Sequence, residues 1–124
     1  FRAVGAKTLL VSGGITFFTE RLKARLQLDH TLANTLQVKD GKLTGEVEGA
    51  IVDAQAKADM VAGWKAKYAG SDGLVVTLGD GANDLPMFAV ADVSIAYRAK
   101  PVVRAAATHT IDHCGLDAAL NYFS

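Results

Sequence analysis

The chain has 124 residues, a length typical of one domain; half of them are hydrophobic and 21% are charged, which excludes a disordered protein. Its 13 basic and 13 acidic side chains cancel, so it lacks the basic excess of proteins that bind nucleic acid or anionic membranes, and no apolar run approaches the ~18 residues that cross a bilayer. The single cysteine, Cys114, excludes an internal disulfide and is typical of a reducing compartment, so we expect a cytoplasmic protein.

Two short apolar runs, at residues 7–11 and 74–78, predict strands that are buried on both faces of a parallel sheet. The first run ends at Ser12-Gly13-Gly14 and the second at Gly79-Asp80-Gly81. A helix is expected after each run. The first helix, over residues 15–26, has the pattern of a helix that packs one face on a core, with apolar positions at Ile15, Phe18, Leu22 and Leu26.

The remaining elements alternate between strands and helices. Residues 36–48 predict a β-hairpin with Asp40-Gly41 in its turn, too polar for the main core. Asp53 is expected to cap a helix that runs to about Tyr68. Further along the chain we expect a helix at 84–91, a strand at 93–97, a helix at 101–107, a short strand at 110–111 and a helix at 116–123. This order predicts an α/β fold, a Rossmann-like parallel sheet flanked by helices.

The two glycine-rich turns are expected at the same edge of the sheet. In a parallel sheet with right-handed crossovers, the loops at the carboxyl ends of the strands carry function. Both Ser12-Gly13-Gly14 and Gly79-Asp80-Gly81 follow strands at that edge. We therefore expect them to face one small ligand.

The densest chemical signal is the segment from Gly79 to Asp84. Asp80, Asn83 and Asp84 offer hard oxygen ligands, and Mg²⁺ needs only one or two protein carboxylates. Gly79 and Gly81 let the backbone turn sharply and approach a ligand. A helix cap would explain one acid or one amide, but not two acids, an amide and two glycines within six residues. We therefore favour a Mg²⁺ site over a simple cap.

Two other features suit a phosphate group. Ser12-Gly13-Gly14 offers a hydroxyl and backbone N–H groups at the start of a helix, which is an arrangement that binds phosphate. This turn is common, and it gains weight only beside the acidic segment. Lys57, one turn into the helix capped by Asp53, can balance the charge of a phosphate. By spacing alone, however, a solvated surface lysine is the simpler interpretation of Lys57.

In this order, the Ser-Gly-Gly turn, the helical lysine and the sequence Gly-Asp-Gly-Ala-Asn-Asp-Leu-Pro-Met resemble the haloacid dehalogenase-like phosphohydrolases, over nearly the whole chain from about Lys7. Members that hydrolyse phosphoserine in serine biosynthesis are the most similar. The resemblance implies an Mg²⁺-dependent enzyme in which an aspartate attacks the phosphoryl group and water then hydrolyses the phospho-aspartyl intermediate. It implies that Ser12 and Gly13 bind the phosphate, Lys57 neutralises the phosphate and the nucleophile, Asp80 binds the metal, Asn83 contacts the substrate, and Asp84 orients Lys57 and the waters on the metal.

One part of the family pattern is missing. The motif Asp-x-Asp-x-Thr, which supplies the nucleophile and the general acid–base, does not occur in the sequence. The cap domain that holds the substrate would also precede Phe1. The resemblance thus implies that residues 1–124 are the C-terminal portion of the hydrolase core, inactive alone. Because the family's nucleophile strand lies between the strands predicted at 7–11 and 74–78, we expect self-association through exposed sheet edges.

Other interpretations stay open at this point. The full-length protein can be a phosphatase or mutase for another small phosphate ester, or this chain can be a non-catalytic phosphate-binding fragment. His109, His113 and Cys114 lack the fourth ligand of a structural zinc site, and we expect Cys114 to be buried as a small hydrophobic residue.

Overall fold

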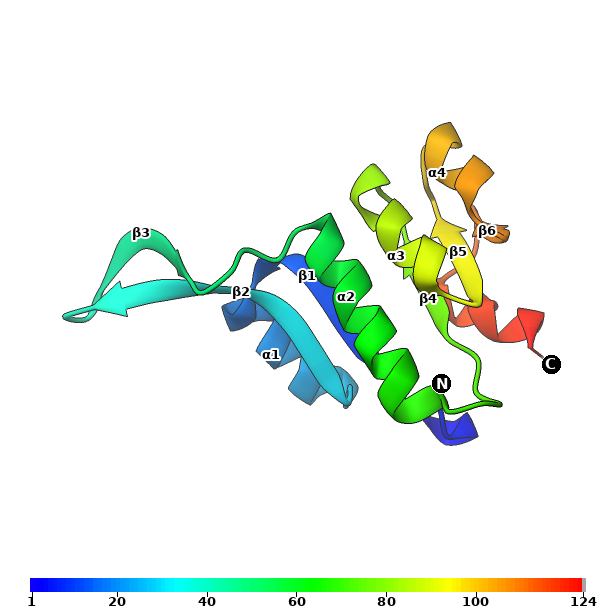
Figure 1. Ribbon diagram of the computed structural model, residues 1–124, viewed down its shortest axis with the longest axis horizontal. Coiled ribbons are helices and arrows are strands. Elements are labelled where there is room, and N and C mark those ends of the chain that lie inside the picture. Colours follow the sequence, from blue (N-terminus) through cyan, green and yellow to red (C-terminus); the bar gives the residue numbers. More distant parts are fainter. Residues whose placement is uncertain (124) are drawn as a thin grey trace. The chain divides into compact units, whose positions relative to one another are not determined.

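The computed structural model describes residues 1–123. The chain divides into two compact units, Phe1–Lys57 and Ala58–Ser124, and each contains one three-stranded sheet. Parallel strands and flanking helices occur in both, which confirms the predicted α/β class (Figure 1). Among the described residues, no helix has the length and apolar character needed to cross a membrane.

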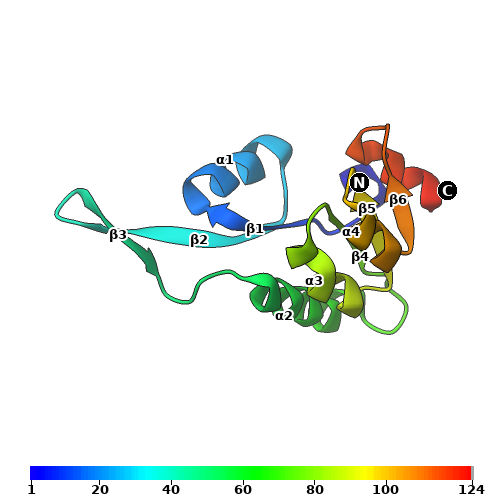
Figure 2. The same cartoon turned by 90° about the horizontal axis from the view of Figure 1, so that it is seen from above.

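The sheet of the first unit has the order β1-β2-β3. Strand β1 (Leu9–Ile15) is parallel to β2 (His30–Lys39), and helix α1 (Thr16–Leu26) connects them. Strand β3 (Lys42–Glu48) returns antiparallel to β2. Figures 1 and 2 show this hairpin extending beyond β1 and α1. Its two turn residues, Asp40 and Gly41, both have positive φ, 52° and 75°, as a tight hairpin turn requires.

Helix α1 exposes the apolar residues that the sequence pattern assigned to the core. Phe18 is 60% exposed, Leu22 42% and Leu26 60%. The helix instead meets β2 through polar groups: Thr19 is buried, and the Thr31 hydroxyl donates to the Glu20 carboxylate over 2.5 Å. The expectation of a core-facing apolar stripe is therefore wrong for this helix, because its sheet-facing side is the polar one.

The sheet of the second unit has the order β4-β5-β6, and all its strands are parallel. The strands are β4 (Val76–Gly79), β5 (Val93–Tyr97) and β6 (His109–Ile111). Helices α3 (Leu85–Val90) and α4 (Pro101–Ala106) form the two crossovers, and a 3₁₀ turn over Ala82–Asp84 precedes α3. A 3₁₀ helix over Leu116–Tyr122 follows β6.

Helix α2 (Ala54–Trp64) begins in the first unit and ends in the second, where a π-helical turn over Lys65–Ala69 follows it. The predicted helix up to Tyr68 is therefore confirmed over most of its length, with a change of winding in its last turn. Within residues 58–123, Val61 of α2 belongs to the hydrophobic core.

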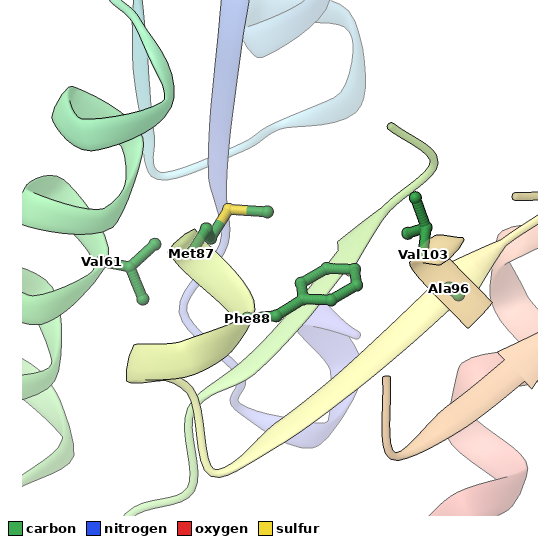
Figure 3. Packing of buried hydrophobic residues seen from close by; sticks show 5 residues of the cluster. All are labelled: Val61, Met87, Phe88, Ala96 and Val103. Atoms are coloured by element: carbon green, nitrogen blue, oxygen red, sulfur yellow. The ribbon is translucent and has the colours of Figure 1, made fainter. Parts of the chain in front are cut away.

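The core of the second unit covers both faces of its sheet. On one face, a cluster joins Val61, Met87, Phe88, Ala96 and Val103 (Figure 3). On the other face, Ile95 packs with Ile111 and Ala119. Ile95 and Ala96, neighbours on β5, are both fully buried, which explains why this strand has no polar alternation.

One prediction about the C-terminal part is wrong. Cys114 is exposed rather than buried, because it lies in the loop between β6 and the last helix and belongs to neither hydrophobic cluster. Its backbone carbonyl accepts a hydrogen bond from the Arg98 guanidinium over 3.3 Å.

Candidate active site

The Ser12-Gly13-Gly14 turn lies inside β1 as the structure defines it, rather than after the strand. The pairing of β1 with β2 is irregular between Val11 and Ile15, so the backbone departs from the regular ladder at this turn. The Ser12 hydroxyl oxygen accepts the Gly14 N–H over 3.0 Å, while Gly13 and Gly14 are exposed. Helix α1 begins directly afterwards, at Thr16.

A buried side chain that no sequence motif indicated holds this turn. Asn34 of β2 is only 8% exposed. Its amide Nδ2 donates to the Gly13 carbonyl over 2.9 Å, and its Oδ1 accepts the Val52 N–H over 2.7 Å. Strand β2 begins at His30, six residues before the predicted hairpin, and asparagine is uncommon within strands, so the sequence pattern gave no signal for Asn34.

The residues after Val52 start the helix that carries Lys57. The Asp53 carboxylate accepts the Ala56 N–H over 2.8 Å, and the Asp53 carbonyl accepts the Lys57 N–H over 3.1 Å, which confirms Asp53 as the cap. Lys57 itself is only 5% exposed. The simpler interpretation of Lys57 as a solvated surface residue is therefore wrong. A lysine buried to this degree is rarely there for packing alone.

The acidic turn of the second unit is organised by Asp84. This residue is 6% exposed, and its Oδ2 accepts the N–H groups of Asp80 over 3.1 Å and Gly81 over 3.3 Å. Asp80 and Asn83 are exposed on the same turn. A Cβ atom on Gly79 would lie 2.5 Å from Asp84 Oδ2, so only glycine leaves room for this carboxylate. The result is a compact turn with one carboxylate buried and another beside it in solvent.

The carboxylates of this turn are oxygen donors of the kind that Mg²⁺ prefers. Within residues 1–123, no group of three or more His, Cys, Asp or Glu side chains is placed to hold a metal. A structural zinc site needs four such ligands, whereas Mg²⁺ is held by one or two carboxylates together with water and phosphate. Asp80 and Asp84, separated by one short turn, meet that smaller requirement.

The predicted site residues fall into two groups. Ser12, Gly13 and Lys57 lie in the first unit, where Asn34 links the Ser12-Gly13 turn to the residue preceding the capped helix. The second group, Asp80, Asn83 and Asp84, shares one turn of the second unit. Since β1 and β4 belong to separate sheets, the meeting of both turns at one edge stays a prediction.

Known proteins resemble this chain closely in sequence. A phosphoserine phosphatase from Vibrio cholerae is 45% identical over 114 residues, which are 92% of this chain and 35% of the relative. One from Polaromonas sp. is 44% identical over 117 residues, 91% of this chain and 50% of the relative. The chain therefore spans half or less of the length of these two relatives.

Solved structures and a family model agree with the sequence relatives. The crystal structure of a probable phosphoserine phosphatase from Vibrio cholerae, in unliganded form, matches 96% of this chain and 37% of its own with a TM-score of 0.90 and 43% identity. A substrate-bound phosphoserine phosphatase complex matches 98% of this chain and 58% of its own with a TM-score of 0.86 and 38% identity. The family model of the haloacid dehalogenase-like hydrolases matches residues 2–89. The chain therefore belongs to the haloacid dehalogenase-like hydrolase family.

Proposed function

We propose that this chain supplies the phosphate- and metal-binding portion of an Mg²⁺-dependent phosphomonoester hydrolase whose substrate is phosphoserine. The observation that carries the proposal is the acidic turn, in which a buried Asp84 carboxylate accepts two backbone N–H groups and leaves Asp80 in solvent. The relatives named phosphoserine phosphatases support the choice of substrate.

In this proposal, each site residue has a distinct task. Ser12 and Gly13 bind the phosphate, and Lys57 neutralises the phosphate together with the attacking carboxylate. Asp80 would hold the metal. Asp84 would orient both Lys57 and the waters on the metal, and Asn83 contacts the substrate. When bound, Mg²⁺ supplies charge neutralisation at the phosphoryl oxygens. Phosphoryl transfer depends mainly on such positioning and electrostatics, so short turns suffice for it.

The nucleophile is the part that this sequence does not contain. No Asp-x-Asp occurs in the 124 residues. We therefore propose that residues 1–124 are the C-terminal portion of the hydrolase core and that an aspartate from outside this sequence attacks the phosphorus. The chain alone then binds phosphate and Mg²⁺ without turnover, since a covalent route needs its nucleophile. A cytoplasmic location stays part of this proposal.

Self-association is a further part of the proposal. Within the described residues, β1 pairs with β2 alone and β4 pairs with β5 alone. Both are thus edge strands of their sheets, and both are largely apolar. Open edges of this kind pair readily with other strands.

The test uses an Asp80→Asn variant of the full-length gene product and follows phosphate release from phosphoserine while Mg²⁺ is varied. We expect the variant to lose roughly 10²–10³-fold in Mg²⁺-dependent turnover, because it lacks a charged metal ligand. Asp72→Asn, which removes an exposed carboxylate in another loop of the same unit, should keep activity within about twofold.

Each alternative has its own outcome. Unchanged Mg²⁺ dependence of Asp80→Asn would reject the metal assignment. Release from other small phosphate esters but not from phosphoserine would change the substrate, and no release from any ester would favour a non-catalytic phosphate-binding protein. Turnover of phosphoserine by the 124-residue chain alone would refute an external nucleophile.

A further inference from the structure

We propose that Asn34 is a positioning residue that fixes the Ser12-Gly13 turn against the start of α2, so that the phosphate-binding turn and the Lys57 helix keep one geometry. This inference rests on the proposed function, because it assigns a role within the same anion site. It concerns the first unit only, Phe1–Lys57. Asn34 itself is not among the groups assigned to the phosphate.

The contacts of Asn34 join two segments that are far apart in sequence. Its Nδ2 donates to the carbonyl of Gly13, 21 residues away, over 2.9 Å. Its Oδ1 accepts the N–H of Val52, 18 residues away, over 2.7 Å. A Cβ atom on Gly13 would lie 3.8 Å from the Val52 carbonyl oxygen, so the two segments are also within van der Waals reach. One side chain thus ties both backbones together.

The chemistry of these partners requires an amide. The Gly13 carbonyl can only accept and the Val52 N–H can only donate, which fixes the orientation of the Asn34 amide. An aspartate would lack the donor, and an aliphatic residue would leave both backbone groups unpaired. Asn34 and Val52 are each 8% exposed, so water would not readily replace Asn34 as the partner of the Val52 N–H, although Gly13 is exposed.

The link continues from Val52 to Lys57. Asp53, the next residue, caps α2 with its carboxylate and accepts the Lys57 N–H with its carbonyl. A shift of Val52 therefore moves the first turn of α2, and a shift of Gly13 moves the phosphate turn. Sub-ångström placement of this kind sets how well an anion is bound. Loss of Asn34 should loosen both parts of the site together.

The experiment compares Asn34→Ala with Thr31→Ala in the 124-residue chain. Thr31 is a matched control because it lies on β2, is also 8% exposed and also makes a side-chain hydrogen bond, but to Glu20 of α1. Inorganic phosphate is titrated into each protein while the backbone amide resonances are followed by NMR, and urea unfolding gives the stability of each variant.

In the wild-type chain we expect phosphate to shift the amides of Gly13 and Gly14, and also Val52 and the Asn34 side-chain NH₂. Asn34→Ala should weaken phosphate binding by about tenfold or more, whereas Thr31→Ala should stay within about twofold at a comparable loss of stability. That split supports a positioning role. Equal weakening in both variants, or none in Asn34→Ala, would overturn it and leave the proposed function intact.

Two further outcomes complete the test. If the wild-type chain binds no phosphate, the proposed phosphate site is refuted, and the positioning role of Asn34 is refuted as well. If Asn34→Ala does not fold, the phosphate titration of the wild-type chain tests the positioning role without the variant. Slower hydrogen exchange of the Val52 N–H on phosphate binding supports the link, and binding at Gly13 with no change at Val52 and Asn34 refutes it.

Discussion

At the scale of single residues, Gly79 is constrained by its neighbour. Its Cβ would lie 2.5 Å from Asp84 Oδ2, so Gly79→Ala should displace the carboxylate and cost about 1–3 kcal/mol of unfolding free energy. Gly63→Ala is the control, because a Cβ there meets nothing within 4 Å and the position lies inside α2. That variant should be stabilised by about 0.5–1 kcal/mol. Urea unfolding measures both, and equal effects would contradict the steric argument.

Thr77 carries a buried hydroxyl that has no hydrogen-bond partner among the described residues. Thr77→Val removes this unsatisfied group at similar volume, and we expect about 1 kcal/mol of added stability. Ser94, its partner in the parallel pair, is the control, since its hydroxyl accepts the Thr108 N–H over 3.1 Å. Ser94→Ala should cost about 1–3 kcal/mol. A loss of stability in Thr77→Val on thermal or urea unfolding would indicate a partner that the structure does not show.

Residues differ in how well the sequence predicts their place. The acidic segment was recognisable because its two acids, amide and glycines stand together, and the structure explains Gly79 by the position of Asp84. For Lys57, helical spacing alone favoured a solvated surface position, and its burial shows that this interpretation was wrong, whereas the resemblance assigned it to the site. Asn34 was missed because its partners, Gly13 and Val52, are far from it in the chain.

At the scale of elements, Asp92 anchors the start of the second sheet. Its carboxylate accepts the Lys65 ammonium over 2.5 Å and the Val75 N–H over 2.8 Å. The hydrogen bond from Lys65, followed by that from Val75, lowers the pKa of Asp92 below its usual 3.8. A lowered folded-state pKa adds stability above the unfolded value, and this stability is lost as the pH falls through the folded pKa.

The Asp92→Asn variant should be less stable than the wild type at about pH 7. The difference in unfolding free energy should shrink as the pH falls below 3.8 toward the lowered pKa of Asp92. Urea unfolding at about pH 7 and about pH 3 measures this. A difference that stays constant between the two pH values would show that the carboxylate charge does not contribute.

The elements were predicted best where tertiary contacts agree with the local pattern. The strand at 93–97 is β5 itself, because apolar residues cover both its faces. The hairpin turn follows from Asp40-Gly41, which suits positive φ. Helix α1 was predicted in place but not in orientation, since the side that contacts β2 is set by Thr19 and Glu20. Periodicity identifies an apolar side and not what covers it.

At the scale of the whole molecule, our proposal of self-association rests on β1 and β4, which are edge strands of their sheets. Sedimentation velocity on the 124-residue chain should show a mass that rises with concentration, and hydrogen exchange of β4 amides should slow in parallel. The central strand β5, paired on both sides, serves as the internal reference. A monomer at every concentration would contradict this prediction.

A control variant separates the sheet edges from the exposed face of α1. Leu22→Glu places a charge among the apolar residues of that face, where Phe18 and Leu26 are each 60% exposed. If sheet edges drive association, the variant should associate as the wild type does. If Leu22→Glu is monomeric at every concentration, the interface lies on the exposed face of α1 and not at the sheet edges.

The fold class was predictable from local patterns, whereas the placement of β1 and β4 in separate sheets was expected only from the family resemblance. Alternating strands and helices indicate α/β from the sequence alone, and parallel strands with flanking helices occur in both units. The separation into two three-stranded sheets has no local signal. It depends on which strands pair with one another, and contacts between residues that are distant in the chain determine that pairing.

The tip of the β2–β3 hairpin offers a place for added sequence. Asp40 and Gly41 are exposed, and they form the turn beyond the last cross-strand pair, Lys39 and Lys42. Exposed tips of this kind tolerate inserted peptides, because few native hydrogen bonds cross them. An epitope or a fluorescent-protein graft between these two residues would therefore label the protein while sparing both of its terminal ends.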